Sequence, residues 1–442
     1  MRAIRLGVVL AMIAGATASA ADWPQWRGPL GTGATDEKDL PLRWSATENV
    51  AWKASLGGVG VSSPIVAGNL VFATSQIGDG VSRQGPRLAQ GTDSAGAERS
   101  LAKASTAAAG DKVFFLVEAF DRASGRRVWE YRLEAAAPLQ PVHDKHNLAS
   151  PSPVTDGQHV YAWFGTGQVV ALDMNGKLAW QRHLGREISA FDVNWGHSSS
   201  PTLYQDMLIL LCDHAPASYL LAVDTRTGKD RWKVDRGKGR SSYTTPFVVQ
   251  AGSGPELIVN SSERVDAYDP RTGAFLWHVG GSNQFPIPVP TLGNGVIYMT
   301  RGYRSGPYMA IRPGGRGDVS TSHVVWEVPT GAPYISSLVH DGGLLYMASD
   351  VGAISVIDAA TGRRLWQERV NGLFTASPVA GDGKIYFVSE TGEVIVIRAG
   401  REPQVIARND IGERLMASPA ISNGQIFLRS DGALFAIGKP RG

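Results

Sequence analysis

The chain repeats one pattern of apolar and polar positions: two short apolar strands, a polar turn and a tryptophan. The stretch SPTLYQDMLILLCDHAPASYLLAVDTRTGKDRW, Ser200 to Trp232, shows the pattern in full. The same signal recurs in segments that close at Trp129, Trp180, Trp277 and Trp366, and less regularly at Trp326. Short runs with period-two alternation, bounded by turn residues, are typical of β-strands. The pattern therefore predicts a succession of strands joined by tight turns.

Eight copies of this unit follow one another. Their starts fall at Ser63-Pro64, Ser152-Pro153, Ser200-Pro201, Thr245-Pro246, Val289-Pro290, Ser336-Ser337 (where Pro is lost), Ser377-Pro378 and Ser418-Pro419. Most starts lie about 40 to 48 residues apart, the length of a four-stranded propeller blade. The first spacing is longer because of the segment Ser75 to Lys112, which is rich in Gly, Ala, Ser and charged residues. We expect a flexible insertion there, serving as a lid or partner arm, or merely tolerated.

The turn and the tryptophan of each unit have separate structural tasks. In DTRTGK, Asp224 can accept backbone N–H groups and Gly228 can adopt the positive φ that a tight turn requires. The Trp after each turn is expected to start the outermost strand and to pack between neighbouring blades. Its regular placement favours packing over a role as a sugar or quinone platform.

The two ends of the repeat region complement each other. The last copy, SPAISNGQIFLRSDGALFAIG, stops at Gly438 without an outer strand, whereas Asn49 to Leu56 carries Trp52 where a closing Trp belongs. This N-terminal strand is expected to complete the last blade and so remove an exposed sheet edge. The sequence thus predicts an all-β, eight-bladed propeller of four-stranded antiparallel blades over residues 49–438.

The chain start and the composition indicate where the protein works. Residues 1–20 place Arg2 and Arg5 before an apolar stretch that ends in Ala-Ser-Ala, the pattern of a cleavable secretory signal, and residues 21–48 form an N-terminal extension. No cysteine stands at the cleavage site, and the single Cys212 is expected to be buried and inert. We expect a periplasmic or extracellular monomer without a transmembrane segment. The net charge of +3 gives no indication of nucleic-acid binding.

The repeat also resembles a known family. The signature A-x-D-x-x-[TS]-G-x-x-x-W, complete at Ala119–Trp129, Ala222–Trp232 and Ala267–Trp277, resembles the repeat of the pyrroloquinoline quinone (PQQ) propeller superfamily. The opening DWPQWRGP, Asp22 to Pro29, is similar to the start of secreted members. The resemblance implies the propeller fold. It leaves function open, since the superfamily includes PQQ-dependent alcohol dehydrogenases, the BamB scaffold of outer-membrane assembly and members without an assigned role.

Unusual polar residues gather on one predicted face. Loops that join blades, and the turns between the second and third strands of a blade, emerge on the same face, where propellers place their sites. The predicted ligand-binding residues on this face are His143, His146, Asn147, Asp192, Asn194, Trp195, His197, Asp213, His214, Arg240, Tyr243, Glu263, Arg264, Arg301, Tyr303 and Arg304. Asn260, Asn283, Glu390 and Arg429 occupy corresponding segments. His197 is expected to point into the channel mouth. The mixture of Arg, His and Tyr suits an anionic or polyhydroxylated ligand.

Two functions remain open from the sequence. PQQ dehydrogenases in the superfamily carry adjacent cysteines, a calcium site and an aspartate base, whereas Cys212 is the single cysteine here. A Ca²⁺ site built from Asn260, Glu263 and Asp192, or a metal held by several histidines, has no spacing motif to support it. We therefore expect a non-catalytic binding or scaffold protein with an envelope protein, a glycan or a small anionic ligand as partner. The alternative is a PQQ- or metal-dependent oxidoreductase with its site in the channel mouth.

Overall fold

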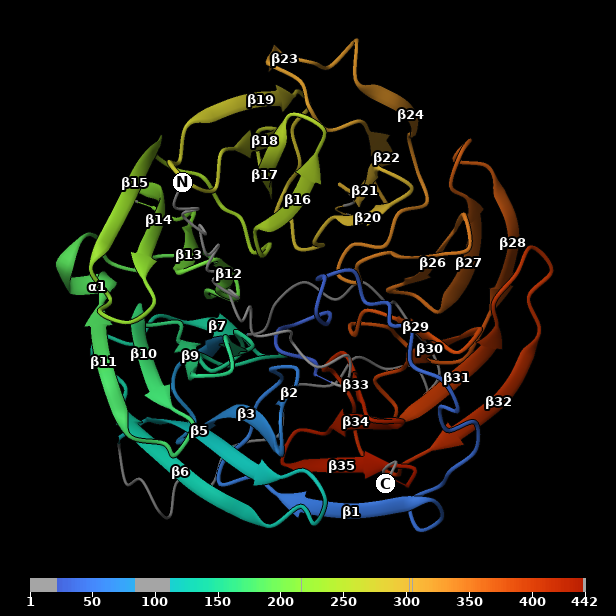
Figure 1. Cartoon of the computed structure of the whole chain (residues 1–442), viewed down its shortest axis with the longest axis horizontal. Helices are drawn as coiled ribbons and strands as arrows, with labels where there is room; N and C mark the ends of the chain where they lie inside the picture. Colours follow the sequence, from blue (N-terminus) through green and yellow to red (C-terminus); the bar gives the residue numbers. More distant parts are fainter. Residues whose placement is uncertain (1–21, 84–111, 216, 302, 304, 440–442) are drawn as a thin grey trace, which may run out of the picture.

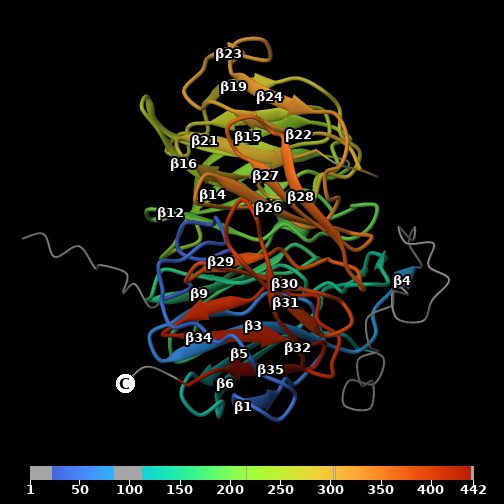
Figure 2. The ribbon, with the colours of Figure 1, turned by 90° about the vertical axis from the view of Figure 1, so that its right-hand side faces the viewer.

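The computed structural model describes residues 22–83, 112–215, 217–301, 303 and 305–439. Within them the strands form eight radial sheets around a central channel (Figure 1), and Figure 2 shows the ring from its edge. The predicted signal at residues 1–20 and the predicted site residue Arg304 lie outside the described residues. The four-residue α1 (Leu184–Glu187) stands beside blade 2, and the described part of the chain contains no helix with the length and apolar character of a membrane span.

Each blade is built on four antiparallel strands, which in blades 1 to 7 run outward in chain order. Blades 1 to 4 comprise β2 (Ile65–Ala67), β3 (Leu70–Ile77), β5 (Phe114–Asp121) and β6 (Arg127–Glu134); β8 (Val154–Thr155), β9 (His159–Trp163), β10 (Gln168–Asp173) and β11 (Leu178–His183); β12 (Thr202–Tyr204), β13 (Met207–Cys212), β14 (Ser218–Asp224) and β15 (Asp230–Gly237); β16 (Phe247–Ala251), β17 (Gly254–Asn260), β18 (Val265–Tyr268) and β19 (Phe275–Val279).

Blades 5 to 8 follow the same plan. They comprise β20 (Thr291–Gly293), β21 (Val296–Thr300), β22 (Tyr308–Ile311) and β24 (Val324–Val328); β25 (Val339–Asp341), β26 (Leu344–Ser349), β27 (Ala353–Asp358) and β28 (Arg364–Arg369); β29 (Val379–Gly381), β30 (Lys384–Val388), β31 (Glu393–Arg398) and β32 (Val405–Asp410); β33 (Ala420–Ser422), β34 (Gln425–Arg429), β35 (Ala433–Ile437) and β1 (Val50–Ser55).

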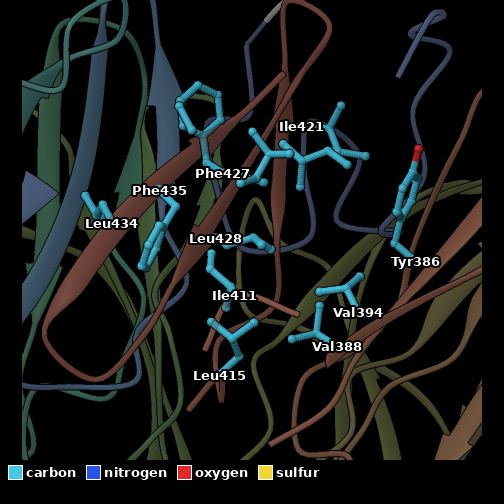
Figure 3. Packing of buried hydrophobic residues seen from close by; sticks show 14 of the residues in the cluster. Tyr386, Val388, Val394, Ile411, Leu415, Ile421, Phe427, Leu428, Leu434 and Phe435 are labelled. Atoms are coloured by element: carbon cyan, nitrogen blue, oxygen red, sulfur yellow. The ribbon is translucent and has the colours of Figure 1, made fainter. Parts of the chain in front are cut away.

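The predicted ring closure is confirmed. β1 pairs antiparallel with β35, with Trp52 opposite Ala436, so the N-terminal strand completes the C-terminal blade. The apolar residues of blades 7 and 8 pack into one cluster at this closure (Figure 3), because both sheets bury the faces that they turn to each other. The prediction of four strands fails at blade 4, where the short β23 (Gly317–Asp318) adds a parallel fifth strand to β19.

The predicted insertion begins inside a strand. Residues Ser75 to Ile77 continue β3 and pair with β5, with Ile77 opposite Phe114. Beyond them, β4 (Ser82–Arg83) pairs parallel with β7 (Val142–His143) and stands apart from the blades in Figure 2. Residues 84–111 lie outside the described part of the chain. The described end of the insertion thus leads to the loop that carries His143.

The tryptophans join neighbouring blades through the turn glycines. Trp180 of blade 2 donates its Nε1–H to the Thr225 carbonyl of blade 3 at 2.8 Å, and a Cβ placed on Gly228 would lie 2.8 Å from the Trp180 ring. Equivalent contacts join Trp52 to Gly125, Trp129 to Gly176, Trp232 to Gly273 and Trp326 to Gly362. The glycine of each turn therefore allows a positive φ and also leaves room for the tryptophan of the preceding blade.

A ring of hydroxyl groups lines the inner edge of the blades. At each blade start an amide donates to the hydroxyl of the next blade, from Ser63 to Ser152 (2.8 Å), Ser152 to Ser200 (2.9 Å), Ser200 to Thr245 (2.9 Å), Val289 to Ser337 (3.0 Å), Ser337 to Ser377 (2.9 Å), Ser377 to Ser418 (2.9 Å) and Ser418 to Ser63 (3.0 Å). Val289 has no hydroxyl, so the link from Thr245 to blade 5 is missing. The ring also corrects the predicted start of blade 6, because Ser337 and not Ser336 takes the serine position.

The N-terminal extension closes one end of the channel. In Figure 1 the segment before β1, coloured blue, crosses the middle of the ring. Its residues bond to inner strands around the ring: Trp23 to Val66 of blade 1, Thr32 to Thr291 of blade 5 and Thr35 to Ala380 of blade 7. Arg27, which is 1% exposed, donates to the carbonyls of Gly31, Thr32 and Leu338. We call residues 22–48 the plug.

Candidate functional site

A cavity of about 230 Å³ lies on the channel axis. Segments that lead into all eight blades contribute to its wall, and Trp26 of the plug also lines it. The lining residues are Trp26, Val61, Ser63, His143, Lys145, His146, Ser150, Ser152, Trp195, Ser198, Ser200, Tyr243, Phe285, Ile287, Tyr303, Tyr334, Ile335, Thr375, Met416, Ala417 and Ser418. Because the plug contacts the opposite ends of the inner strands, the cavity is a blind chamber on the loop-bearing face.

Four aromatic side chains form a continuous arc along one wall. Tyr243 contacts Phe285 with ring centroids 6.3 Å apart, Phe285 contacts Tyr303 at 5.6 Å, and Tyr303 contacts Tyr334 at 5.1 Å. All three contacts are edge-to-face, the arrangement that the ring quadrupole favours. The residues come from loops that lead into blades 4, 5 and 6 and from the second-to-third strand turn of blade 5. We call these four residues the aromatic arc.

The opposite wall is built by the loop between blades 1 and 2. His143 lies against Trp195 with centroids 5.7 Å apart, and His146 donates its Nε2–H to the Trp195 carbonyl at 2.9 Å. Lys145 of the same loop extends past blades 1 and 8, and its Nζ lies 2.7 Å from Glu390 Oε1 at the end of β30. The loop therefore crosses part of the mouth and is held on its far side by a largely buried ion pair.

Burial shifts the pKa of one group near each wall of the cavity. Desolvation, with a smaller contribution from His143, lowers the pKa of His146 to about 4, so this imidazole is neutral at pH 7. Asp350 follows β26 and accepts the backbone N–H groups of Tyr334 at 2.7 Å and Ile335 at 2.9 Å. Desolvation raises the pKa of Asp350 to about 6, against the effect of these hydrogen bonds. Asp350 thus holds one end of the aromatic arc in place.

The structure brings only part of the predicted site together. His143, His146, Trp195, Tyr243 and Tyr303 line the cavity. Asn147 lies beneath the loop, where its Nδ2–H donates to the Val59 carbonyl and its Oδ1 accepts the Ala149 amide. Asp192 and Asn194 are exposed and do not line the cavity.

His197 does not point into the mouth as expected. It is 2% exposed and packs against Trp163, with centroids 4.1 Å apart, and against Phe191 at 5.2 Å. Desolvation, reinforced by His214, lowers the pKa of His197 to about 3. His214 is also buried, between Phe191 and Tyr219. Both imidazoles act as packing groups between blades 2 and 3.

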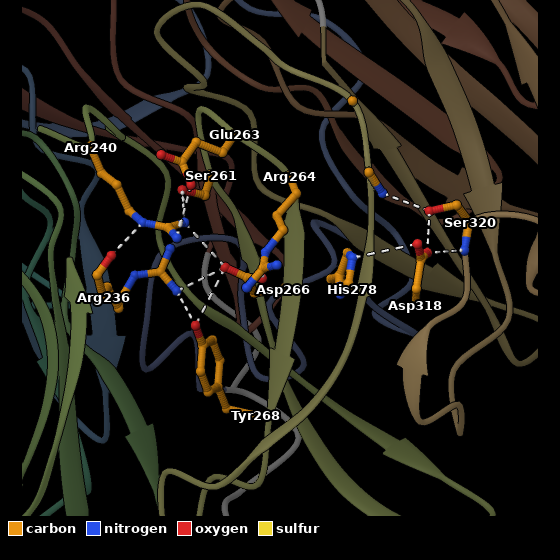
Figure 4. Close-up of polar contacts among 12 residues, drawn as sticks. Arg236, Arg240, Ser261, Glu263, Arg264, Asp266, Tyr268, His278, Asp318 and Ser320 are labelled. Atoms are coloured by element: carbon orange, nitrogen blue, oxygen red, sulfur yellow. Dashed lines mark hydrogen bonds and ion pairs between the residues drawn. The ribbon is translucent and has the colours of Figure 1, made fainter. Parts of the chain in front are cut away.

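Four more predicted residues belong to an ion-pair network between blades 3 and 4 (Figure 4). Arg236 at its centre is fully buried and lies 2.7 Å from Asp213 and 3.1 Å from Asp266. Arg264 lies 2.6 Å from Asp266, and Arg240 lies 2.9 Å from Glu263. These charges neutralise one another, and Asp213, Arg240, Glu263 and Arg264 are not among the residues that line the cavity. Arg301 is also buried but stands outside the network.

The sequence reasoning missed several lining residues. Trp26 belongs to the opening DWPQWRGP, which indicated a family resemblance but not a position in the channel. Phe285 and Tyr334 lie in loops between blades, and an aromatic residue in such a loop is the signal that identifies them in hindsight. Lys145 lies between the predicted residues His143 and His146, but its cross-channel partner Glu390 is 245 residues away.

The cavity residues do not fit PQQ with calcium. PQQ is a tricarboxylate, and the cationic side chain on the wall is Lys145, which Glu390 neutralises. Calcium prefers six to eight oxygen ligands, most of them from carboxylates and carbonyls. Among the described residues, no three His, Cys, Asp or Glu side chains converge as a metal site requires. Asn260, Glu263 and Asp192, considered above as calcium ligands, are not among the lining residues.

Comparisons with known proteins agree with the fold. The family model described as outer membrane protein assembly factor BamB matches residues 113–286, 316–402 and 352–440, well over half of the chain. No match is found among curated proteins. BamB from Moraxella catarrhalis is a similar solved structure, with a TM-score of 0.54, 16% identity, and coverage of 73% of this chain and 90% of that one.

Two further solved structures are similar. The quinohemoprotein alcohol dehydrogenase ADHIIG from Pseudomonas putida HK5 has a TM-score of 0.62 at 12% identity and covers 96% of this chain and 81% of its own. The computationally designed Ika8 protein has a TM-score of 0.55 at 10% identity, with coverage of 87% and 98%. At these identities the solved structures support the fold alone. On the strength of the family match, the chain belongs to the PQQ-like, BamB-like β-propeller family.

Proposed function

We propose that this chain is a non-catalytic binding protein that holds a glycan in the blind cavity on its loop-bearing face. The observation that carries the proposal is the aromatic arc, which faces His143, His146 and Trp195 across the cavity. Aromatic faces can stack on the C–H faces of a sugar ring, and imidazole and hydroxyl groups can bond to its OH groups. A volume of about 230 Å³ suits one ring rather than a drug-sized ligand.

The polar groups of the cavity support a polyhydroxylated ligand over an anionic one. Arg240 and Arg264, expected to attract an anion, pair with carboxylates outside the cavity. Ser63, Ser152, Ser200 and Ser418 line it instead. Each of these hydroxyls accepts an amide from the preceding blade and still has its own proton to donate.

The titrating groups support binding over acid–base catalysis. A general base works best when its pKa lies near the working pH. Burial lowers the pKa of His146 to about 4, and Lys145 is held in an ion pair with Glu390. His146 is therefore suited to hold its hydrogen bonds rather than to exchange protons at neutral pH.

The test is a titration of the purified protein with N-acetylglucosamine, glucose and galactose, followed by tryptophan fluorescence, since Trp26 and Trp195 line the cavity. We expect a saturable change with at least one sugar. Phe285→Ala and Tyr303→Ala should each weaken binding roughly tenfold, because a stacking contact contributes about 1 to 1.5 kcal/mol. Phe275→Ala, which removes an exposed aromatic from the outer strand β19, is the matched control and should bind as the wild type.

The opposite outcome is equally clear. If none of the sugars binds and PQQ with Ca²⁺ binds one to one, the glycan proposal fails and the oxidoreductase alternative replaces it. A sugar response that survives both cavity variants would place the ligand elsewhere on the molecule.

We also propose that the protein works in the periplasm or outside the cell, where an envelope protein can share the same face. The pattern of Arg2, Arg5 and Ala-Ser-Ala in residues 1–20 and the match to the BamB family model support this placement. Cell fractionation should find the chain outside the cytoplasm with Ala21 as its first residue. Recovery of full-length chain from the cytoplasm alone would contradict it.

A further inference from the structure

Arg301 carries a buried guanidinium that has no carboxylate partner among the described residues. It follows β21 at the start of the turn between the second and third strands of blade 5, and it is 3% exposed. Its Nη2 donates to the Gly281 carbonyl and, at 3.5 Å, to the Ser261 carbonyl. Within the described residues, its Nη1 has no hydrogen-bond partner and no carboxylate lies within ion-pair distance. Burial lowers the pKa of Arg301 to about 10, and the distant charges of Glu327 and Asp266 only partly oppose this.

Several polar side-chain atoms in residues near Arg301 also have no hydrogen-bond partner in the described part of the chain. Asn283 is 5% exposed, and in the described part of the chain neither its Nδ2 nor its Oδ1 has a partner. The same holds for Oδ1 of Asn260 and Oγ1 of Thr300, both in fully buried residues. Arg27 and Arg429 are also buried and also have side-chain nitrogen atoms without a hydrogen-bond partner. Arg301 differs from them in lying near these three residues.

Backbone contacts place the four residues in one seam between blades 4 and 5. The turn after β17 is the common element: Arg301 donates to the carbonyl of Ser261, and the amide of Asn283 donates to the carbonyl of Ser262 at 2.7 Å. Asn260, at the end of β17, donates its Nδ2–H to the Thr300 carbonyl at 3.1 Å. We call this group of Asn260, Asn283, Thr300 and Arg301 the seam cluster.

The unpartnered donors and acceptors determine which kind of ligand would complement the seam cluster. A buried, unpaired guanidinium and a buried carboxamide without partners are each unfavourable by several times the thermal energy, unless a complementary group is present. Arg301 Nη1 and Asn283 Nδ2 are donors that require an acceptor, preferably an anion for the guanidinium. Oδ1 of Asn260 and of Asn283 can accept a hydrogen bond from a hydroxyl or from water. We infer that the seam cluster binds a small oxyanion, such as a carboxylate, a sulfate or a phosphate group.

The seam has a route for such an ion. Gly281, Ser282 and Gln284 are exposed and separate the cluster from solvent on the loop-bearing face. Gly281 has a φ of 100°, and no atom lies within 4 Å of the place where a Cβ would stand, so this side of the backbone is open. An oxyanion could thus enter next to Asn283 while the inner strands stay in place.

The seam cluster is separate from the proposed glycan site. Its residues do not line the cavity, although Phe285 and Tyr303 of the aromatic arc follow Asn283 and Arg301 by two positions. The ion would therefore lie behind the arc, and the inference does not depend on what the cavity binds. Failure of one test leaves the other unaffected.

The experiment measures the Tm of the purified protein in sodium phosphate, sulfate and acetate, with chloride at equal ionic strength as reference. We expect a saturable rise of roughly 3 °C at a hundredfold excess over Kd for a chain of this length. Arg301→Gln should abolish the saturable rise. Arg264→Gln, on the same side of blade 4 but paired with Asp266, is the matched control and should keep it. A response to acetate alone would assign a planar carboxylate, and a response to phosphate and sulfate alone a tetrahedral ion.

A second variant keeps the test decisive if Arg301→Gln does not fold. Asn283→Asp keeps the size of the side chain and adds a resident carboxylate to the seam cluster. We expect a higher Tm in chloride and no further saturable rise with the other anions, because the internal charge takes the place of the ion. The inference is overturned if Asn283→Asp lowers the Tm and keeps the anion response, or if the wild type shows only the linear, non-saturable rise that excluded salts produce.

Discussion

Asp350 shows at the scale of one residue how burial sets the properties of the site. Its carboxylate is enclosed by protein atoms, although part of the residue remains accessible, and it accepts the two amides that position Tyr334 and Ile335. Desolvation nevertheless raises its pKa to about 6, with Lys145 as the nearby positive charge that opposes the shift. Because the folded pKa lies above the unfolded value, the folded state binds more protons between about pH 4 and 6. Stability from this group therefore falls as the pH rises through that range.

This gives a pH prediction. Relative to Asp350→Asn, which does not titrate, the wild type should gain about 1 to 2 kcal/mol of unfolding free energy when the pH is lowered from 7 to 4.5. The measurement is urea unfolding of both proteins at pH 4.5, 6 and 7. Parallel pH profiles for the two proteins would show that the Asp350 carboxylate is not perturbed.

At the scale of elements, one turn in each of blades 1, 2, 3, 4 and 6 is shaped by a tryptophan of the blade before it. The turn of blade 3 ends at Gly228, which has a φ of 68° and lies against the Trp180 ring of blade 2. A side chain at Gly228 would meet both a strained backbone and the indole. Gly295, in a turn of blade 5, has a similar φ of 74° but nothing within 4 Å of a Cβ. A comparison of the two glycines therefore separates the effect of a positive φ from the effect of packing against the tryptophan ring.

The paired substitutions test this separation. Gly295→Ala should destabilise by about 1 kcal/mol, the effect of a positive φ alone. Gly228→Ala should destabilise by about 2 to 4 kcal/mol, because the Trp180 ring must also move. Thermal or urea unfolding measures both. Equal losses would mean that the indole adjusts freely and that the turn is not locked to its neighbour.

At the scale of the whole molecule, three features hold the eight blades together. β1 pairs with β35, the plug crosses the channel, and the hydroxyl ring joins the inner ends of the blades. The hydroxyl ring has one gap, where the buried Val289 follows Thr245. A hydroxyl at Val289 would supply the missing acceptor for the Thr245 amide.

Filling the gap should stabilise the ring. Val289→Thr keeps the branched shape and should raise the unfolding free energy by about 1 kcal/mol, the usual net value of one hydrogen bond. Ser377→Ala, which removes a link on the other side of the ring, should lower it by about the same amount. Urea unfolding compares the three proteins. A loss of stability in Val289→Thr would show that burying the hydroxyl outweighs the new bond.

The sequence by itself determined the ring and its closure. Period-two strands, the Asp-x-x-[TS]-Gly turn and the spaced tryptophans encode local geometry, and repetition of one unit defines a blade count and a closure by β1. The sequence also placed His143, His146, Trp195, Tyr243 and Tyr303 on the loop-bearing face, and all five line the cavity. This was possible because loops on one face of a propeller converge on its axis.

Only the tertiary structure decided which polar residues face the cavity. His197 packs against Trp163, and Asp213 pairs with Arg236, because a loop residue can turn inward or into the seam between blades without a change in sequence pattern. The plug, the Lys145–Glu390 pair and the seam cluster all bring together segments that are far apart in the chain. Such contacts depend on distances that no local periodicity encodes.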